Sequence, residues 1–307
     1  MNMKHMNIAT TDLNLLKVFE ALHDEGSASR AAILLGVTQS AVSAALSRLR
    51  VLYGDPLFLR TGRGLTPTLL ANQLKPVISD ALNKCRQSLS MASPMPTSFQ
   101  GRSVTIGLSD DFEIAMGRRL LDIIARRAPQ LRVIFRQSHS QIIGDALLSR
   151  SIDLAISAGG LSSRTLSREL LGEGGYSCVV DPEQVQLDPA TFDVAQFVEH
   201  EQVLISSGGF IGVVDEALAL LGLKRKVVAS TTHFAALPYL IKGTRTIATI
   251  PEHAAQAIAR VSGLQVLKCP LQLRRYPIEL GWRTQELTEA AVIEAKAAIK
   301  ACFGQPE

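Results

Sequence analysis

The sequence predicts an α/β protein with an all-α N-terminal part: a winged helix-turn-helix, a long linker helix and a two-lobed α/β domain. Three observations predict this order. Residues 27–50 hold two short helices around a glycine turn, residues 67–92 carry one long apolar stripe, and strand-like and helix-like segments alternate from residue 102 onward. We therefore expect the winged helix-turn-helix at residues 1–66, the linker helix at 67–92, a hinge at 93–101 and the two-lobed α/β domain at 102–307.

The helix-turn-helix is indicated by capping residues at fixed places. A first helix begins near Asp12, and Ser27 is suited to cap the second, which Gly36 can end in a left-handed conformation. Thr38 is suited to cap a third helix over residues 39–53. Three short helices of this size make one small unit. One face of the third helix is apolar, with Val42, Leu46, Leu49 and Tyr53.

The opposite face of residues 39–53 is polar and contains no acid; it carries Gln39, Ser40, Ser43, Ser47 and Arg50. Short polar side chains near the start of a helix can approach base edges in the major groove, and an amide such as Gln39 can pair bidentately with adenine. Taken alone, the stretch also fits an ordinary helical hairpin with a solvated serine-rich face. The segments on either side favour DNA binding.

A hairpin wing is predicted after this helix. Residues 57–59 resemble a short strand, and Gly62 and Gly64 allow a tight turn with Arg60 and Arg63 at its tip. Cationic side chains on such a wing suit phosphate or minor-groove contacts, which add affinity without sequence choice. Either arginine alone also fits a solvated loop position.

The linker helix is predicted to start at Thr66 as cap, with Pro67 in the first helical position. A stripe on one face favours pairing with a second copy of the chain; it contains Leu70, Leu74, Val77, Ala81, Cys85 and Leu89. Pro76 lies within this helix and removes one backbone hydrogen bond. Residues 93–97, Ser-Pro-Met-Pro-Thr, then break the helix and indicate a hinge.

Composition narrows the class of protein. Residues 1–90 contain ten Lys and Arg against six Asp and Glu, so the formal net charge of +4 lies in the first third of the chain and suggests that this end meets a polyanion. The four cysteines are scattered, which favours unpaired thiols in a reducing cytoplasm. Neither a signal peptide nor a run long enough to span a bilayer is present, so a cytoplasmic location away from membranes is expected.

The histidines have no metal-ligand spacing, and no phosphate loop or nucleophile elbow occurs. We therefore expect no metal, no cofactor and no enzymatic activity. An α/β enzyme with an appended regulatory domain stays open as an alternative, because unassigned Ser, His and Asp side chains can converge in space.

The C-terminal two-thirds predicts a mostly parallel sheet with helices on both faces. Strands are expected at residues 103–109, 131–137, 152–157, 177–180, 202–206, 226–230, 246–250, 264–269 and 277–282, and helices near 111–128, 140–149, 212–221, 233–242, 251–261 and 288–302. Ligands bind beyond the carboxyl ends of strands in such folds. Serine or threonine is present at five of these ends, at residues 109–111, 138–139, 157–159, 206–208 and 231–233, which suits a small polar ligand.

The order of parts resembles the LysR-type transcriptional regulators. Residues 12–50 and 55–68 are similar to the family's winged helix-turn-helix, and the helix that follows is similar to its dimerising linker. The remainder resembles the family's periplasmic-binding-protein-like effector domain. Residues 126–135, 151–157, 214–228, 232–241 and 246–255 look closest to the subgroup of nodulation regulators and regulators that respond to aromatic acids.

The resemblance implies specific site residues. Bases would be faced by Gln39, Ser40, Ser43 and Ser47, and phosphates or the minor groove by Arg48, Arg50, Arg60 and Arg63. The effector would lie between the lobes near Ser109, Asp110, Ser138, Ser206, His233 and Phe234. His233 equally fits a packing role, and Phe234 a core position. Where many members have an Arg-x-x-His-Pro turn, residues 179–187 read VVDPEQVQL.

An aromatic or other small organic acid is the effector that the resemblance suggests. Asp110 and Asp111 would repel its carboxylate unless a cation such as Arg283 or His233 compensates.

The leading interpretation is a sequence-specific transcriptional regulator that binds double-stranded promoter DNA as a homodimer or homotetramer. A small-molecule effector in the inter-lobe cleft would switch the DNA-bound oligomer, with RNA polymerase as a further candidate partner. Two alternatives stay open: a DNA-binding regulator that needs no ligand, and a cytoplasmic small-molecule-binding module without DNA binding.

Overall fold

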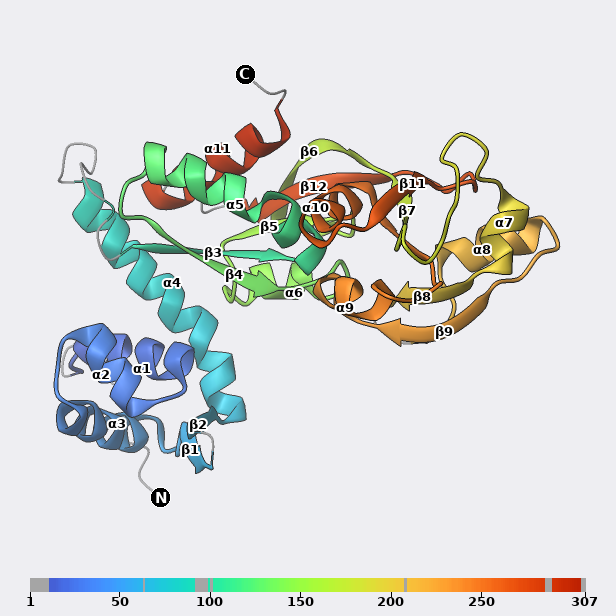
Figure 1. The fold of residues 1–307 in the computed structure, drawn as a ribbon. Coiled ribbons are helices and arrows are strands. Elements are labelled where there is room, and N and C mark those ends of the chain that lie inside the picture. The colour runs from blue at the N-terminus through green and yellow to red at the C-terminus, as the bar shows by residue number, and fades with distance from the viewer. Residues whose placement is uncertain are drawn as a thin grey trace. The chain divides into compact units, whose positions relative to one another are not determined.

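The chain forms two compact units, residues 1–96 with 148–151 and residues 97–147 with 152–307. Figure 1 shows the ribbon of this computed structural model, which describes residues 11–62, 64–91, 99, 102–206, 209–284 and 289–304. Each unit has its own hydrophobic core. Most of the predicted hinge at 93–101 lies outside the described residues.

The three predicted N-terminal helices are present as α1 (Asn14–Glu25), α2 (Ala28–Leu35) and α3 (Gln39–Tyr53). The Ser27 hydroxyl accepts from the Arg30 backbone N–H, and Gly36 ends α2 with φ of 66°. The Thr38 hydroxyl accepts from the Ala41 backbone N–H at 3.2 Å, so both predicted caps are confirmed. The apolar face of α3 is buried with α1 and α2 in one core, where Phe19, Val42 and Leu49 are each 0% exposed.

The wing consists of β1 (Phe58–Thr61) and β2 (Gly64–Pro67), which pair antiparallel. The predicted helix start at Thr66 and Pro67 is wrong, because these residues pair with Leu59 and Phe58 in the hairpin. Helix α4 (Leu69–Met91) begins two residues later, where the Thr68 hydroxyl accepts from the Ala71 backbone N–H at 3.2 Å. Thr66 and Thr68 are both suitable capping residues, and Thr68 is the one that caps α4.

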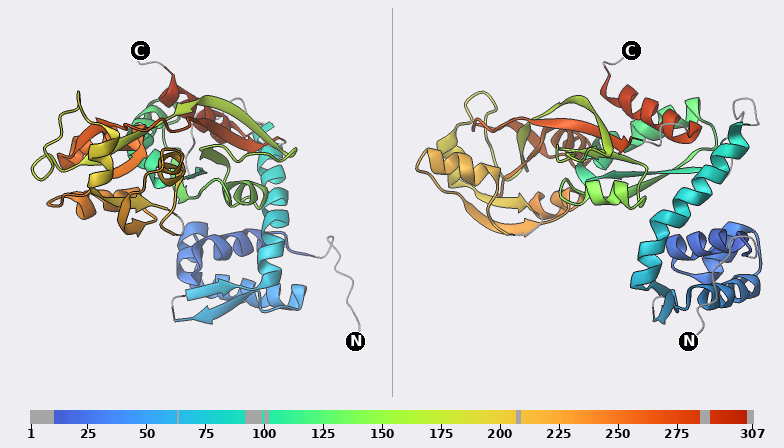
Figure 2. Two further views of the ribbon diagram at one scale, coloured as in Figure 1. Left: turned by 90° about the vertical axis from the view of Figure 1, so that its right-hand side faces the viewer. Right: turned by 180° about the vertical axis from the view of Figure 1, so that it is seen from behind.

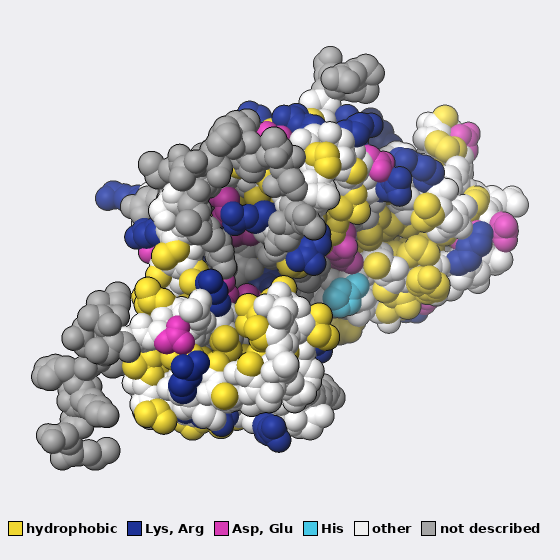
Figure 3. Space-filling model, turned by 90° about the vertical axis from the view of Figure 1, so that its left-hand side faces the viewer, with side chains coloured by type: hydrophobic (Ala, Val, Ile, Leu, Met, Phe, Trp, Pro, Cys, Tyr) yellow, Lys and Arg dark blue, Asp and Glu magenta, His cyan; other side chains and the backbone are white. Residues whose placement is uncertain are grey.

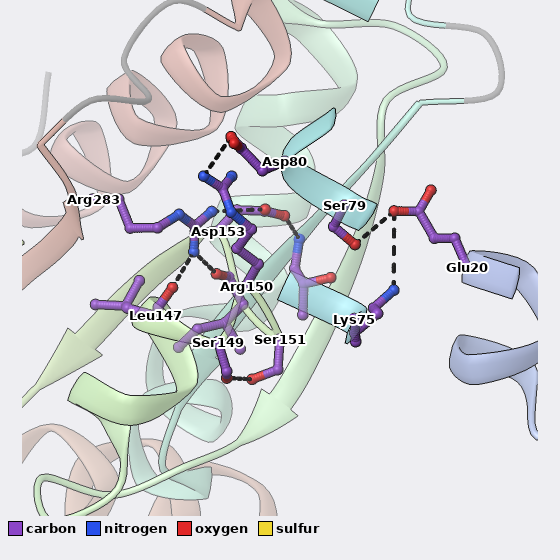
Figure 4. Close-up of polar contacts among 12 residues, drawn as sticks. Glu20, Lys75, Ser79, Asp80, Leu147, Ser149, Arg150, Ser151, Asp153 and Arg283 are labelled. Atoms are coloured by element: carbon purple, nitrogen blue, oxygen red, sulfur yellow. Dashed lines mark hydrogen bonds and ion pairs between the residues drawn. The ribbon is translucent and has the colours of Figure 1, made fainter. Parts of the chain in front are cut away.

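Helix α4 packs against α1 through apolar and charged contacts. Ala71, Ile78 and Leu82 are buried in the shared core. Lys75 lies 2.7 Å from an Asp24 oxygen and 4.0 Å from a Glu20 oxygen; Figure 4 shows the Glu20 contact, together with the 2.7 Å hydrogen bond that the Ser79 hydroxyl donates to Glu20. In the same unit, the Arg150 guanidinium pairs with Asp80 of α4 at 2.8 Å.

The second unit has two lobes, which Figures 1 and 2 show side by side. The first lobe is built on a five-stranded sheet in the order β4-β3-β5-β12-β6. The strands are β3 (Ser103–Leu108), β4 (Arg132–Gln137), β5 (Leu154–Ser157), β6 (Leu166–Gly174) and β12 (Tyr276–Arg283). Its helices are α5 (Asp110–Arg127), α6 (Ile143–Leu148) and α11 (Ala290–Phe303), and α5 and α11 contribute to the core of this lobe.

The second lobe contains a three-stranded sheet in the order β10-β7-β11 and a pair β8-β9, joined by a bridge between Gln202 and Ile247. The strands are β7 (Tyr176–Val180), β8 (Glu201–Ile205), β9 (Lys226–Thr231), β10 (Ala248–Pro251) and β11 (Gln265–Lys268). The helices are α7 (Val194–Glu199), α8 (Val213–Leu220), the 3₁₀ turn η2 (Phe234–Ala236), α9 (Leu237–Ile241) and α10 (Glu252–Ser262).

The prediction of a mostly parallel sheet is wrong: the sheets are mixed. Strand β3 runs parallel to β4 and β5, whereas β12 runs antiparallel to both β5 and β6. After β6 the chain passes from the first lobe to the second, and it comes back to the first lobe in β12. The two strands therefore run in opposite directions (Figure 2). Local hydrophobic periodicity locates strands without fixing their direction.

Among the described residues, no single helix has the length and apolar composition needed to cross a bilayer; α2 and α3 meet the criterion only as a pair bent by 108°, by length and composition alone.

Candidate nucleic-acid interface and effector cleft

Helix α3 presents one polar face to solvent. Gln39, Ser40, Ser43 and Ser47 are all exposed, and none of the residues of α3 is acidic. The Ser29 hydroxyl of α2 donates to the Gln39 side-chain oxygen at 3.1 Å, which ties the first residue of α3 to the preceding helix. The Ser47 hydroxyl donates to the Ser43 carbonyl at 3.1 Å. The four predicted base-facing residues therefore lie on one exposed surface.

The predicted phosphate-contacting arginines differ from one another. Arg48 is exposed and lies 3.4 Å from Asp12, whereas Arg60 is an exposed residue of β1. Arg50 donates from Nε to the Pro56 carbonyl and from Nη2 to the Phe58 carbonyl, both at 2.8 Å. Sequence reasoning missed this second role, in which Arg50 fastens the wing to α3.

The wing tip is only partly described, because Arg63 lies outside the described residues. On the face drawn in Figure 3, the surface of the first unit is mostly white and yellow, with separate dark blue Lys and Arg side chains and less magenta acidic surface. This distribution matches the excess of basic residues in the first third of the sequence. The excess of positive charge in this unit can therefore attract a polyanion.

The second unit contains a cleft of about 330 Å³ between its lobes. A volume of this size accommodates a small organic molecule. The lining combines apolar, aromatic and hydroxyl side chains: Ser109, Asp111, Ser138, His139, Ser140, Ile156, Ser157, Ala158, Tyr176, Leu204, Ile205, Ser206, Gly212, Val213, Val214, Arg225, Phe234, Thr249, Pro251 and Tyr276.

Four of the six predicted effector residues line this cleft, namely Ser109, Ser138, Ser206 and Phe234. The other two do not. Asp110 instead accepts from the Ala235 backbone N–H at 3.1 Å and so connects α5 of the first lobe to η2 of the second. His233 is exposed and precedes η2.

Asp111 is the carboxylate of the cleft, and its side chain is 6% exposed. Both oxygens have donors: the Ser109 hydroxyl contacts Oδ1, and His253 Nε2 lies 3.0 Å from Oδ2. The His253 ring is stacked on Phe112, with centroids 4.6 Å apart and an interplanar angle of 12°. These contacts hold the carboxylate in a fixed position at the junction of α5 and α10.

Arg225 is a lining residue that the sequence analysis did not single out. Its side chain is 1% exposed, and Nε and Nη2 donate to the two Asp215 oxygens at 2.9 and 2.7 Å. Nη1 donates to the Gln202 side-chain oxygen at 3.0 Å. The carboxylate of Asp215 thus neutralises this buried cation. The spacing of ten residues between Asp215 and Arg225 gave no signal, because a helix end and a turn separate them.

Two tyrosines form an aromatic wall. The rings of Tyr176 and Tyr276 lie edge to face with centroids 5.3 Å apart. Burial, followed by the charge of Asp111, raises the pKa of both phenols above its ordinary value, most strongly for Tyr276. Both therefore stay protonated at neutral pH. The Tyr276 hydroxyl and the Ser138 hydroxyl are buried without a hydrogen-bond partner among the described residues.

Arg283, which the sequence analysis offered as a counter-ion for the cleft, has a different place. It is 7% exposed at the end of β12 and donates from Nη1 to the carbonyls of Leu147 and Ile152 (Figure 4). Its Nη2 lies 3.4 Å from Asp153. Arg283 is absent from the cleft lining and holds the chain around α6 instead.

The described residues contain no group of three or more His, Cys, Asp or Glu arranged to hold a metal ion. All four cysteines are free thiols. Cys178 and Cys269 lie next to each other in the core of the second lobe, where hydrogen bonding to Cys269 and burial raise the pKa of the Cys178 thiol.

Comparison with known proteins decides the family. Residues 13–71 match the bacterial regulatory helix-turn-helix protein family lysR, and residues 99–301 match the LysR substrate binding domain. The chain belongs to the LysR family. It is a DNA-binding transcriptional regulator with an effector-binding domain, and the predicted subgroup is confirmed by its relatives.

Among the relatives of this LysR-family protein is the HTH-type transcriptional activator NahR of Pseudomonas putida, which is 31% identical over 91% of this chain and 93% of its own length. Nodulation protein D 1 of Bradyrhizobium japonicum is 32% identical over 86% of this chain and 82% of its own. A probable transcriptional regulator from Pseudomonas aeruginosa has a crystal structure that is 26% identical, covers 94% of this chain and 98% of its own, and superposes with a TM-score of 0.72.

Proposed function

We propose that the polar face of α3 reads base edges in the major groove, with Gln39, Ser40, Ser43 and Ser47 as reading residues. The observation that carries this proposal is that the exposed face of α3 contains no acidic residue. The opposite face of the same helix is buried against α1 and α2. An amide and three hydroxyls can donate to and accept from base edges. Arg48, Arg60 and Arg63 would contact phosphates, and Arg50 would place the wing.

We also propose that the protein acts as a homodimer or a tetramer of such dimers. Helix α4 leaves apolar side chains uncovered in the single chain: Leu69 is 76% and Val77 is 66% exposed, and Cys85 is exposed as well. These residues lie on the helix that leads out of the DNA-binding domain. A paired α4 would set two recognition helices on half-sites about one DNA turn apart.

The cleft would bind a small-molecule effector, and occupancy would change how the oligomer bends or holds its DNA. Its volume, its apolar wall and its hydroxyl groups support this role. We place this activity in the cytoplasm and assign the chain no catalytic step.

Gel-shift titrations on a palindromic promoter fragment and on a scrambled fragment test the reading and positioning roles. Gln39→Ala should reduce the preference for the palindrome by roughly 10-fold or more, because a good amide–base pair contributes about 1–3 kcal/mol of discrimination. Arg60→Ala should weaken binding to both fragments alike and lower the salt dependence.

Matched controls come from exposed positions of α10. Gln256→Ala and Arg260→Ala remove the same side chains from the effector domain and should leave both titrations unchanged. Parent-like binding by Gln39→Ala would remove α3 from the reading role. Loss of preference in Arg60→Ala would instead show that the wing reads sequence.

A further inference from the structure

The charges of the cleft carry an inference about the class of effector. Among the described residues that line the cleft, three are charged or basic: Asp111, His139 and Arg225. Arg225 is the strongest cation among them, and all of its hydrogen-bonding nitrogens are directed to Asp215 and Gln202. A buried guanidinium that already holds a carboxylate in a bidentate pair offers little to a second anion.

Among the described lining residues, Asp111 and His139 are the charged or basic groups that remain. Asp111 receives its hydrogen bonds from a serine hydroxyl and an imidazole rather than from a guanidinium or ammonium group. Arg275, which precedes Tyr276 in the sequence, lies 4.0 Å from Glu252 and 3.5 Å from Glu173, so this cation is also paired. Burial, and after it the charge of Asp111, raises the pKa of Tyr176 and of Tyr276.

Two hydroxyl groups supply the polar contacts that a ligand would meet. The Ser138 side chain is 2% exposed, and its Oγ is buried without a partner among the described residues. The Tyr276 hydroxyl is also without a partner, and it lines the same cleft. Buried polar atoms are nearly always hydrogen-bonded, so these two hydroxyls are suited to donate to or accept from a ligand in the cleft.

We propose that the effector is an uncharged, largely apolar molecule with hydroxyl groups, bound against the Tyr176–Tyr276 wall and hydrogen-bonded to Ser138 and Tyr276. This inference rests on the proposed role of the cleft as the effector site. It departs from the organic acid that the sequence suggested, because Arg283 and His233, the cations expected to receive a carboxylate, do not line the cleft, and Arg225 is already paired with Asp215.

Calorimetric titration of the full-length protein with 2-hydroxybenzyl alcohol and with 2-hydroxybenzoate tests the inference. The two probes share a ring and a phenol, and they differ in a hydroxymethyl group against a carboxylate. The alcohol should bind at least about tenfold more tightly, because a carboxylate would enter beside Asp111 while the guanidinium of Arg225 is already paired. Asp111→Asn should narrow this difference by improving binding of the benzoate.

Tyr276→Phe removes one hydroxyl and keeps the ring, so it should weaken binding of the alcohol severalfold, and Tyr239→Phe at an 87% exposed position should not. Tighter binding of the benzoate than of the alcohol would overturn the inference and leave the effector role of the cleft intact. If neither probe binds at its solubility limit, the inference also fails. Gel shifts without any ligand report on DNA binding separately, so failure of that proposal remains distinguishable.

Discussion

The recognition helix and the effector cleft present polar side chains in opposite ways. On α3 the side chains proposed to read DNA are exposed and are positioned by neighbours close in sequence, such as Ser29 and Thr38. In the cleft, the charged groups are buried and joined to partners on other elements, as in Arg225 with Asp215 and Asp111 with His253. A DNA surface can therefore be inferred from a helical pattern, whereas the chemistry of a cleft depends on which charges the fold has already neutralised.

We expect the greatest loss of stability when the buried ion pair between Arg225 and Asp215 is broken. Arg225→Met leaves Asp215 and Gln202 without the donors that now satisfy them, and breaking a buried pair in this way costs about 3–5 kcal/mol of unfolding free energy. Urea denaturation of the two variants Arg225→Met and Lys226→Met provides a matched comparison. The adjacent Lys226 pairs with Glu201 but is 72% exposed, so its variant should lose less than about 1 kcal/mol. Equal losses would show that burial is not what separates the two pairs.

The stability of the first unit should depend on the close approach of Gly64 in the wing to Gly26 after α1. Gly64 in the wing has φ of 130°, and a Cβ built there would lie 2.5 Å from the Gly26 carbonyl oxygen. Gly64→Ala should therefore cost roughly 1–3 kcal/mol of stability, and it should weaken DNA binding through a displaced wing. Gly62→Ala is the matched control, because a Cβ there meets nothing within 4 Å. A neutral Gly64→Ala would mean that the wing adjusts freely.

A smaller effect should appear as a change with pH. Burial by itself would raise the pKa of Asp215, but hydrogen bonds from Arg225 and from the Gly212 N–H outweigh it, and the pKa lies below its ordinary value. A lowered pKa in the folded state stabilises the protein above the unfolded pKa of about 3.9, and this contribution is lost as pH falls through the folded value. The difference in stability between parent and Asp215→Asn should therefore narrow below about pH 4. A constant difference across this window would contradict the assignment.

The same contrast explains what could be predicted from the sequence. The bounds of α3 follow from Thr38 and Gly54, which lie at its ends, so local chemistry was sufficient. Helix α7 was missed although Asp193 and Gln196 form a capping box that could have revealed it. Strand β6 was also missed; its polar and half-buried pattern lacks the apolar alternation that marks other strands.

The serines of the cleft could be predicted from the sequence, whereas the positions of the arginines could not. Ser109, Ser138 and Ser206 were found because they follow strands, and the fold brings the ends of those strands together. Arg225 was missed and Arg283 misplaced for one physical reason. The destination of a long cationic side chain depends on the carboxylates and carbonyls that tertiary structure places around it, and these are distant in sequence or on other elements.

The role of α3 in reading DNA can be measured by selecting binding sites from a pool of random DNA with the parent, Gln39→Ala and Gln256→Ala. We expect the parent and Gln256→Ala to select the same two symmetric half-sites, whereas Gln39→Ala should lose its base preference at one equivalent position in each half. An unchanged selected sequence for Gln39→Ala would contradict the claim that α3 reads the DNA.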